Sequence, residues 1–243
     1  YRRAVRIRAD LHNHSCLSPC GDLEMSPTRL VERAAALGIG MLALTDHNSA
    51  KNCPAFDVAC RRHNVIPLFG TETTSREEVH ILSLFRTVEE ALDWGSWVYA
   101  RLPDFRHDPE KLGDQVVVDV DETIIEFEER YLVPGIDASI EEIREETLRR
   151  GGLIIPAHID RSANSIYSQL GFLPGLEFTA LEITRRPIPI DTAGHTVICD
   201  SDAHFVDDIG RRSFTFPAGD GDDPFTALIA ALETEETELS IDG

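Results

Sequence analysis

Cysteine is scarce in this chain, with five residues in 243, and no two of them form a Cys-x-x-Cys pair. An odd number of cysteines without paired spacing indicates neither a disulfide framework nor a four-cysteine zinc site. We therefore expect reduced thiols that mostly pack in the core. They are Cys16, Cys20, Cys53, Cys60 and Cys199.

Basic residues and long apolar runs are also lacking. Lys and Arg number 23 against 43 Asp and Glu, and the formal net charge is −20. This balance argues against a broad surface for duplex DNA, which needs clustered Lys and Arg, but leaves a small substrate or a nucleic-acid end in a pocket open. No apolar run approaches the roughly 20 residues that span a bilayer. Residues 1–3 are not followed by a hydrophobic region of the signal-peptide type. We expect a cytoplasmic protein without a membrane partner, and the oligomeric state stays open.

The sequence does contain an alternation of strand and helix signals. The continuous apolar runs 41–45 and 153–157 are typical of strands that are covered on both faces. Ser26-Pro27 and the capping box Ser139 to Glu142 indicate helix starts. This alternation favours parallel βα units, so we predict one α/β domain over residues 1–243.

An acidic segment at about 86–137 interrupts this alternation. We expect a helix near 89–102, a short strand near 116–120 and a solvated helix near 126–130. About 50 residues is marginal for an independent core, so we interpret the segment as an insertion that covers the mouth of the domain.

His12 and His14 stand at the end of the alternating run 5–9, which is typical of a strand. On extended backbone, residues two apart point the same way, and neutral imidazoles are good ligands for zinc, iron or manganese. The spacing alone is a weak signal, because most His-x-His pairs are ordinary histidines.

Other residues of metal-ligand type lie at or just past the ends of predicted strands. In a barrel of parallel strands these ends meet on one face, where active sites lie. Taken singly, Glu72 could cap a helix, His80 could be a core histidine and Asp202 could hold a turn. Five strands that end in such residues favour a shared metal site. The residues are His12, His14, Asp46, His47, Glu72, His158, Asp202 and His204, with His80 near the start of a further strand.

These motifs resemble those of the PHP family, the superfamily named for polymerases and histidinol phosphatases. The resemblance implies a distorted TIM-like (βα)7 barrel with two or three divalent ions (Zn, Mn or Fe), used mostly for phosphoester hydrolysis. The motifs that carry it are Asp10-Leu-His-Asn-His-Ser15, Thr45-Asp-His-Asn48, Glu72 with His80, Pro156-Ala-His158 and Ser201-Asp-Ala-His204.

The resemblance also implies a ligand set for each ion. His12, His14, Glu72 and Asp202 would hold the first ion; Glu72 as a bridge, with His80 and His158, the second; and His47 with His204 the third.

One departure from the family pattern concerns the third ion. Many members supply another ligand shortly after the His-x-His motif, and here Ser18 is followed by Cys20 and Asp22. We favour Asp22, because a carboxylate suits manganese and iron, whereas a thiolate favours zinc.

Two further residues are candidates for catalysis. Asp46 is expected to orient a ligand or accept a proton, and Arg161 to contact a phosphate, with a surface salt bridge as an equal alternative for Arg161. The leading prediction is a metal-dependent phosphoesterase that acts on a small phosphomonoester or on a nucleotide or nucleic-acid end. The alternatives are an amidohydrolase-like enzyme that cleaves C–N or ester bonds, and a non-catalytic metal-binding module.

Overall fold

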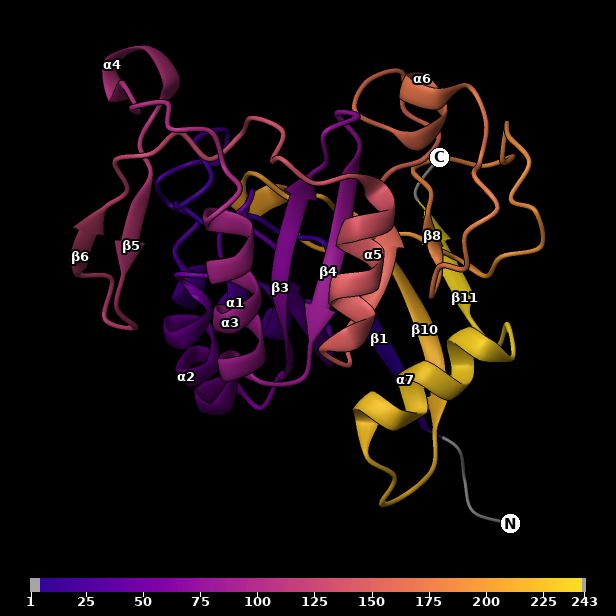
Figure 1. Cartoon of the computed structure of the whole chain (residues 1–243). Coiled ribbons are helices and arrows are strands. Elements are labelled where there is room, and N and C mark those ends of the chain that lie inside the picture. The colour runs from indigo at the N-terminus through magenta and orange to yellow at the C-terminus, as the bar shows by residue number, and fades with distance from the viewer. Residues whose placement is uncertain (1–4, 242–243) are drawn as a thin grey trace.

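A curled sheet of seven strands, in the order β11-β10-β1-β2-β3-β4-β7, forms the frame of the protein (Figure 1). The computed structural model describes residues 5–241. β10 and β11 extend the sheet beyond β1 and were not predicted from the sequence. The strands are β1 (Val5–Asp10), β2 (Met41–Leu44), β3 (Ile66–Thr74), β4 (His80–Phe85), β7 (Leu153–Pro156), β10 (Arg212–Ala218) and β11 (Glu238–Ile241).

Two short parallel strands, β8 (Leu181–Glu182) and β9 (Val197–Ile198), continue the sheet from β7 back to β1. The backbone N–H of Ile159 donates to the carbonyl of Glu182, and that of His14 donates to the carbonyl of Ala203. The ring therefore runs β1-β2-β3-β4-β7-β8-β9, and the prediction of an α/β fold of distorted (βα)7 barrel type is confirmed.

β4 runs antiparallel to its neighbours β3 and β7, which differs from the expected run of parallel units. In this register Thr74 faces His80 and Glu72 faces Leu82. Because β4 runs in the opposite direction, its first residue lies at the same barrel end as the last residues of β3. This reversal brings His80 to the end of the barrel that carries the other predicted ligands.

Helices cover the outside of the sheet. Two predicted helix starts are confirmed: the Ser26 hydroxyl accepts from the N–H of Arg29, and Ser139 forms a capping box with Glu142. Within residues 5–241 no helix is both long and apolar enough to cross a bilayer, while residues 1–3 lie outside the described part. The helices are α1 (Pro27–Ala36), α2 (Cys53–His63), α3 (Val88–Tyr99), α4 (Pro109–Leu112), α5 (Ile140–Arg149), α6 (Ile166–Leu170) and α7 (Pro224–Glu233), with a 3-10 turn η1 (Val206–Asp208).

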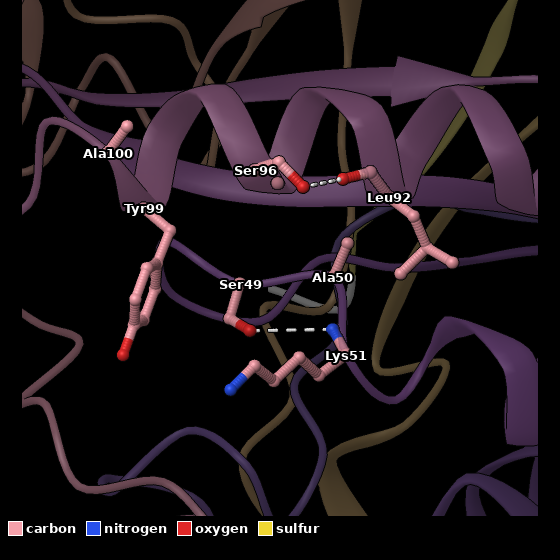
Figure 2. A pocket seen from close by; sticks show the side chains of 8 residues that line it. Ser49, Ala50, Lys51, Leu92, Ser96, Tyr99 and Ala100 are labelled. Carbon is pink, nitrogen blue, oxygen red and sulfur yellow. Dashed lines mark hydrogen bonds between the residues drawn. The ribbon is translucent and has the colours of Figure 1, made fainter.

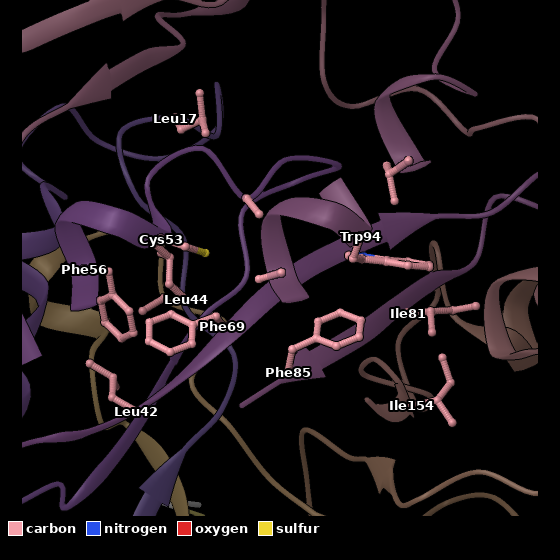
Figure 3. Close-up of a cluster of buried hydrophobic side chains, with 14 of the residues drawn as sticks. Leu17, Leu42, Leu44, Cys53, Phe56, Phe69, Ile81, Phe85, Trp94 and Ile154 are labelled. Atoms are coloured by element: carbon pink, nitrogen blue, oxygen red, sulfur yellow. The ribbon is translucent and has the colours of Figure 1, made fainter. Parts of the chain in front are cut away.

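Apolar side chains fill two layers, one inside the barrel and one between the sheet and the helices. Met41 and Ala43 of β2 belong to the inner layer, whereas Leu42 and Leu44 pack outward with Phe56 of α2 (Figure 3). This alternation follows from the two-residue period of a strand and explains why the run reads as continuously apolar.

α3 packs against the outer face of the barrel sheet. Trp94 is fully buried in the outer layer (Figure 3). Its Nε1 donates to Thr71 Oγ1 at 2.8 Å. The part of the 86–137 segment that leaves the barrel is therefore 100–137. The helix expected near 126–130 is wrong, because β6 (Ile124–Phe127) pairs there with β5 (Val116–Val118).

Gly70 lies where β3 and β4 approach too closely for a side chain. A Cβ at this position would lie 1.9 Å from the carbonyl oxygen of Ser83. We expect Gly70→Ala to lower the free energy of unfolding by more than about 2 kcal/mol, as overpacking of a rigid core does. Gly175→Ala is the control, because no heavy atom lies within 4 Å of its Cβ. Equal denaturation midpoints for the two variants would contradict the close approach.

Candidate metal centre

The predicted metal ligands, with the exception of Asp22, converge at one end of the barrel. They come from different strands, and most are buried. His12 and His14 follow β1, His47 follows β2, Glu72 lies in β3, His80 opens β4, His158 follows β7, and Asp202 and His204 follow β9.

Four of these side chains face one another as ligands of a single ion do. The Nε2 atoms of His12 and His14 lie 3.2 Å apart. Asp202 Oδ1 lies 3.3 Å from each of these nitrogens, and the Glu72 oxygens lie 3.4 and 3.2 Å from them. Ligand atoms of a tetrahedral site with bonds of 2.0–2.1 Å stand about 3.3 Å apart, so this set fits one divalent ion.

Glu72 connects this set to further imidazoles. Its Oε1 lies 2.8 Å from His80 Nδ1 and 3.0 Å from His158 Nε2. Its Oε2 lies 3.2 Å from His47 Nδ1, and ligand atoms of His47, Glu72 and His80 lie within 4.8 Å of one another. A carboxylate with imidazoles at both oxygens can bridge two ions.

A third group consists of histidines alone. Ligand atoms of His14, His47 and His204 lie within 4.8 Å of one another. The ring centroids of His14 and His204 are 4.3 Å apart. Among the described residues, the buried His47 Nδ1 has no hydrogen-bond partner, although it lies 3.2 Å from Glu72 Oε2. Imidazole nitrogens beside carboxylates form a donor set that suits zinc, manganese or iron.

Ser18 fixes the orientation of His14, and Asp46 fixes Ser18. The Ser18 hydroxyl donates to Asp46 Oδ1 at 2.7 Å and lies 3.0 Å from His14 Nδ1. It therefore accepts the Nδ1 proton, which leaves the Nε2 lone pair of His14 directed into the centre. Asp46 also accepts from the backbone N–H and the hydroxyl of Ser15. These contacts agree with the expectation that Asp46 orients a ligand. They provide no support for a role of Asp46 as a proton acceptor.

Charge within the cluster shifts the proton affinities in opposite directions. Burial lowers the pKa of His14, but hydrogen bonds with Asp202 and Glu72 raise it to about 9 overall. Burial and the charge of His14 lower the pKa of His204 to about 4. The pKa of Glu72 stays well below its usual range, because nearby histidine charges outweigh the effect of burial. Without an ion the centre thus holds protons that an ion must displace.

Arg161 lies at the rim of the centre. Its Nη1 is 2.5 Å from Asp202 Oδ2, and 38% of its side chain is exposed. It therefore pairs with a predicted ligand and still reaches solvent.

The structure places Asp22 outside the cluster, which corrects the preference for this residue. Its carboxylate is exposed, and Oδ1 accepts from the N–H of Glu24 at 2.8 Å. Cys20 is an exposed residue outside these ligand groups as well. Burial of its thiol, together with the charges of Glu72 and Asp202, raises the pKa of the thiol to about 12. A carboxylate at Asp22 has suitable ligand chemistry, but the turn in which it accepts from Glu24 directs it outward.

Glu182 and Ser18 contact predicted ligands but were missed in the sequence. Glu182 is fully buried, and its Oε2 lies 3.0 Å from His12 Nδ1. A glutamate between Leu181 and Ile183 in an apolar strand was the available signal, because buried carboxylates require partners. His158 has a φ of 32° and Asp202 a φ of 48°, and such strained backbone in non-glycine residues clusters at functional sites.

A separate cavity of about 310 Å³ lies between α3 and the loop after His47 (Figure 2). Leu92 and Tyr99 contribute to its lining, which includes none of the predicted ligands. Lys51 at its edge pairs with Glu126 and Glu128. These ion pairs attach the 100–137 segment to the loop that follows His47.

A model of the PHP domain matches residues 10–145, which is more than half of the chain. The chain belongs to the PHP domain family. It is similar to a 5'-3' exoribonuclease of Haemophilus influenzae and to a 3',5'-nucleoside bisphosphate phosphatase of Chromobacterium violaceum, with 36% and 37% identity over 78 residues. It also resembles the lesion-specific endonuclease PfuEndoQ from Pyrococcus furiosus, with a TM-score of 0.67 and 18% identity.

These likenesses differ in extent. The matches to the two curated relatives cover 31% of this chain and 27% and 26% of those proteins. The likeness to the endonuclease covers 97% of this chain and 58% of that chain, and it shows the fold alone. The predicted membership of the PHP family is confirmed, and the prediction of a metal-dependent hydrolase agrees with it. The substrates named for these relatives differ.

We expect Cys20, rather than Asp22, to complete the all-histidine group. Cys20→Ala should lower the metal content by about one ion per chain, because loss of a ligand weakens a site. Asp22→Ala is the matched control and should leave the metal content unchanged. Elemental analysis of both variants after metal loading and dialysis decides between them. If Asp22→Ala loses as much metal as Cys20→Ala, the assignment of the thiol is wrong.

Proposed function

We propose that this protein is a metal-dependent phosphoesterase that hydrolyses a small phosphomonoester or a phosphoester at a nucleotide or nucleic-acid end. The observation that supports the proposal best is the bridging position of Glu72, which has imidazoles at both carboxylate oxygens. Two or three adjacent ions are the arrangement that phosphoester hydrolysis uses. Membership of the PHP family supports the same reaction class.

The predicted ligands would have different roles in such a reaction. His12, His14 and Asp202 would hold one ion, and His80 and His158 a second, with Glu72 between them. When bound, the ions lower the pKa of a water nucleophile and stabilise negative charge on the phosphoryl oxygens. Ser18 keeps the His14 ring in place during the reaction, because its hydroxyl is itself held by Asp46.

Arg161 would contact the substrate phosphate. Its guanidinium has five donors and pairs with the carboxylate of Asp202, and its side chain is partly exposed beside the centre. Guanidinium groups bind phosphate oxygens through charge-assisted hydrogen bonds. Arg161 can therefore hold Asp202 in the free protein and share its donors with a phosphate in the complex.

The acidic composition favours a small substrate or a single chain end over a long duplex. A structural neighbour, endonuclease Q, carries a duplex with an abasic lesion at its active site. A duplex with a lesion therefore belongs among the substrates to be tested.

A substrate panel tests the reaction class. Metal-loaded protein should hydrolyse phosphomonoesters, nucleoside bisphosphates or oligonucleotide ends, and should leave amides and carboxyl esters intact.

His158→Ala should lower the turnover by about 10–100-fold or more, because it removes a side chain that helps to hold a metal ion. Arg161→Ala should mainly raise KM, because it removes a phosphate contact.

Folding of both variants is checked by thermal unfolding without metal. Hydrolysis of amides but not phosphoesters would support the amidohydrolase-like alternative. Full binding of metal without turnover of any class would support a binding module.

A further inference from the structure

Glu182 lies in β8 at the inner side of the metal centre. Its carboxylate is fully buried. β8 is only two residues long and pairs with β9. The backbone N–H of Ile159, next to His158, donates to the Glu182 carbonyl and fixes the strand beside the loop after β7.

The first contact of the Glu182 side chain is with the His12 ring. His12 Nδ1 lies 3.1 Å from Oε1 and 3.0 Å from Oε2. A carboxylate accepts, so Nδ1 carries the proton, and the Nε2 lone pair is left to face His14, Asp202 and Glu72. Carboxylates that hold a ligand histidine in this way fix the ring and increase its basicity.

The second contact is with the backbone of His158. The His158 N–H donates to Glu182 Oε2 at 2.7 Å. His158 has a φ of 32°, a conformation that is strained in a residue other than glycine. A short hydrogen bond to a charged acceptor holds the backbone in this conformation, which directs the ring to Glu72 at 3.0 Å.

The two contacts reach separate ligand sets. His12 belongs to the set with His14, Glu72 and Asp202. His158 lies outside that set and contacts Glu72 Oε1, the oxygen that also lies 2.8 Å from His80 Nδ1. We propose that Glu182 is a positioning residue that orients one predicted ligand of each ion, so that both ion sites depend on Glu182 as well as on the bridging Glu72. The inference builds on the metal centre of the proposed function and does not depend on which ester is hydrolysed.

Glu182→Gln is the decisive substitution, because it removes the charge and one acceptor while it keeps the size of the side chain. Asp160→Asn is the matched control. Asp160 is a buried carboxylate that accepts the backbone N–H groups of Thr184 and Arg185 and contacts no imidazole. Both variants lose one charge close to the same strand.

Competition titration of zinc and of manganese with a chelator measures the affinity of each ion. We expect Glu182→Gln to weaken the binding of both the first and the second ion by about 10–100-fold. Asp160→Asn should bind them as the wild type does, even if its unfolding temperature falls. Equal affinities in the two variants, or a loss in Glu182→Gln confined to one ion, would overturn the proposal.

A second measurement, on the metal-free wild-type protein, tests the proposal even if Glu182→Gln folds poorly. In the metal-free wild type, NMR should show a slowly exchanging, downfield-shifted Nδ1 proton of His12, because a buried carboxylate accepts it. Absence of this signal from the wild type would refute the contact itself. Neither readout uses a phosphoester, so a failure of the proposed reaction stays distinguishable from a failure of this inference.

Discussion

The arrangement of this protein depends on one buried carboxylate, Glu72, surrounded by imidazoles. Its two oxygens lie between 2.8 and 3.4 Å from nitrogens of five histidines. A buried charge is unfavourable unless it is paired. Neutral imidazoles can donate hydrogen bonds to a carboxylate but cannot balance its charge. The cluster must therefore hold protons or divalent ions. The surrounding hydrogen bonds, from Ser18 to His14 and from Glu182 to His12, keep the ligand nitrogens directed inward in either state.

The barrel brings this cluster together from strands that are far apart in the sequence. Parallel strands direct their last residues to one end, and the antiparallel β4 adds His80 with its first residue. Gly70 allows β3 and β4 to approach closely at a point two residues before Glu72. Strained backbone at His158 and Asp202 completes the set at the loops. Strand direction, the close approach at Gly70 and the loop conformations at His158 and Asp202 thus position the residues of the polar centre.

Much of this could be predicted from residue type and strand position. The strand-end rule found His12, His14, His47, Glu72, His158, Asp202 and His204, because one barrel end collects them whatever the details of packing. Asp22 was misplaced because its direction depends on a turn whose backbone hydrogen bonds the sequence does not reveal. Glu182 was missed because a single glutamate in a short strand shows its partner only in three dimensions. The acidic run near Glu126 suggested a solvated helix, whereas pairing with β5 makes it a strand.

Metal titration of the metal-free protein, with proton release recorded in weakly buffered solution, tests the central claim most directly. The pKa of His14 is raised to about 9, so at pH 7 this group carries a proton that an ion must displace. The account predicts two or three ions per chain, release of protons on binding, and an affinity that rises as the pH increases from 7 towards 9. Binding of less than one ion, or binding without proton release at pH 7, would contradict it.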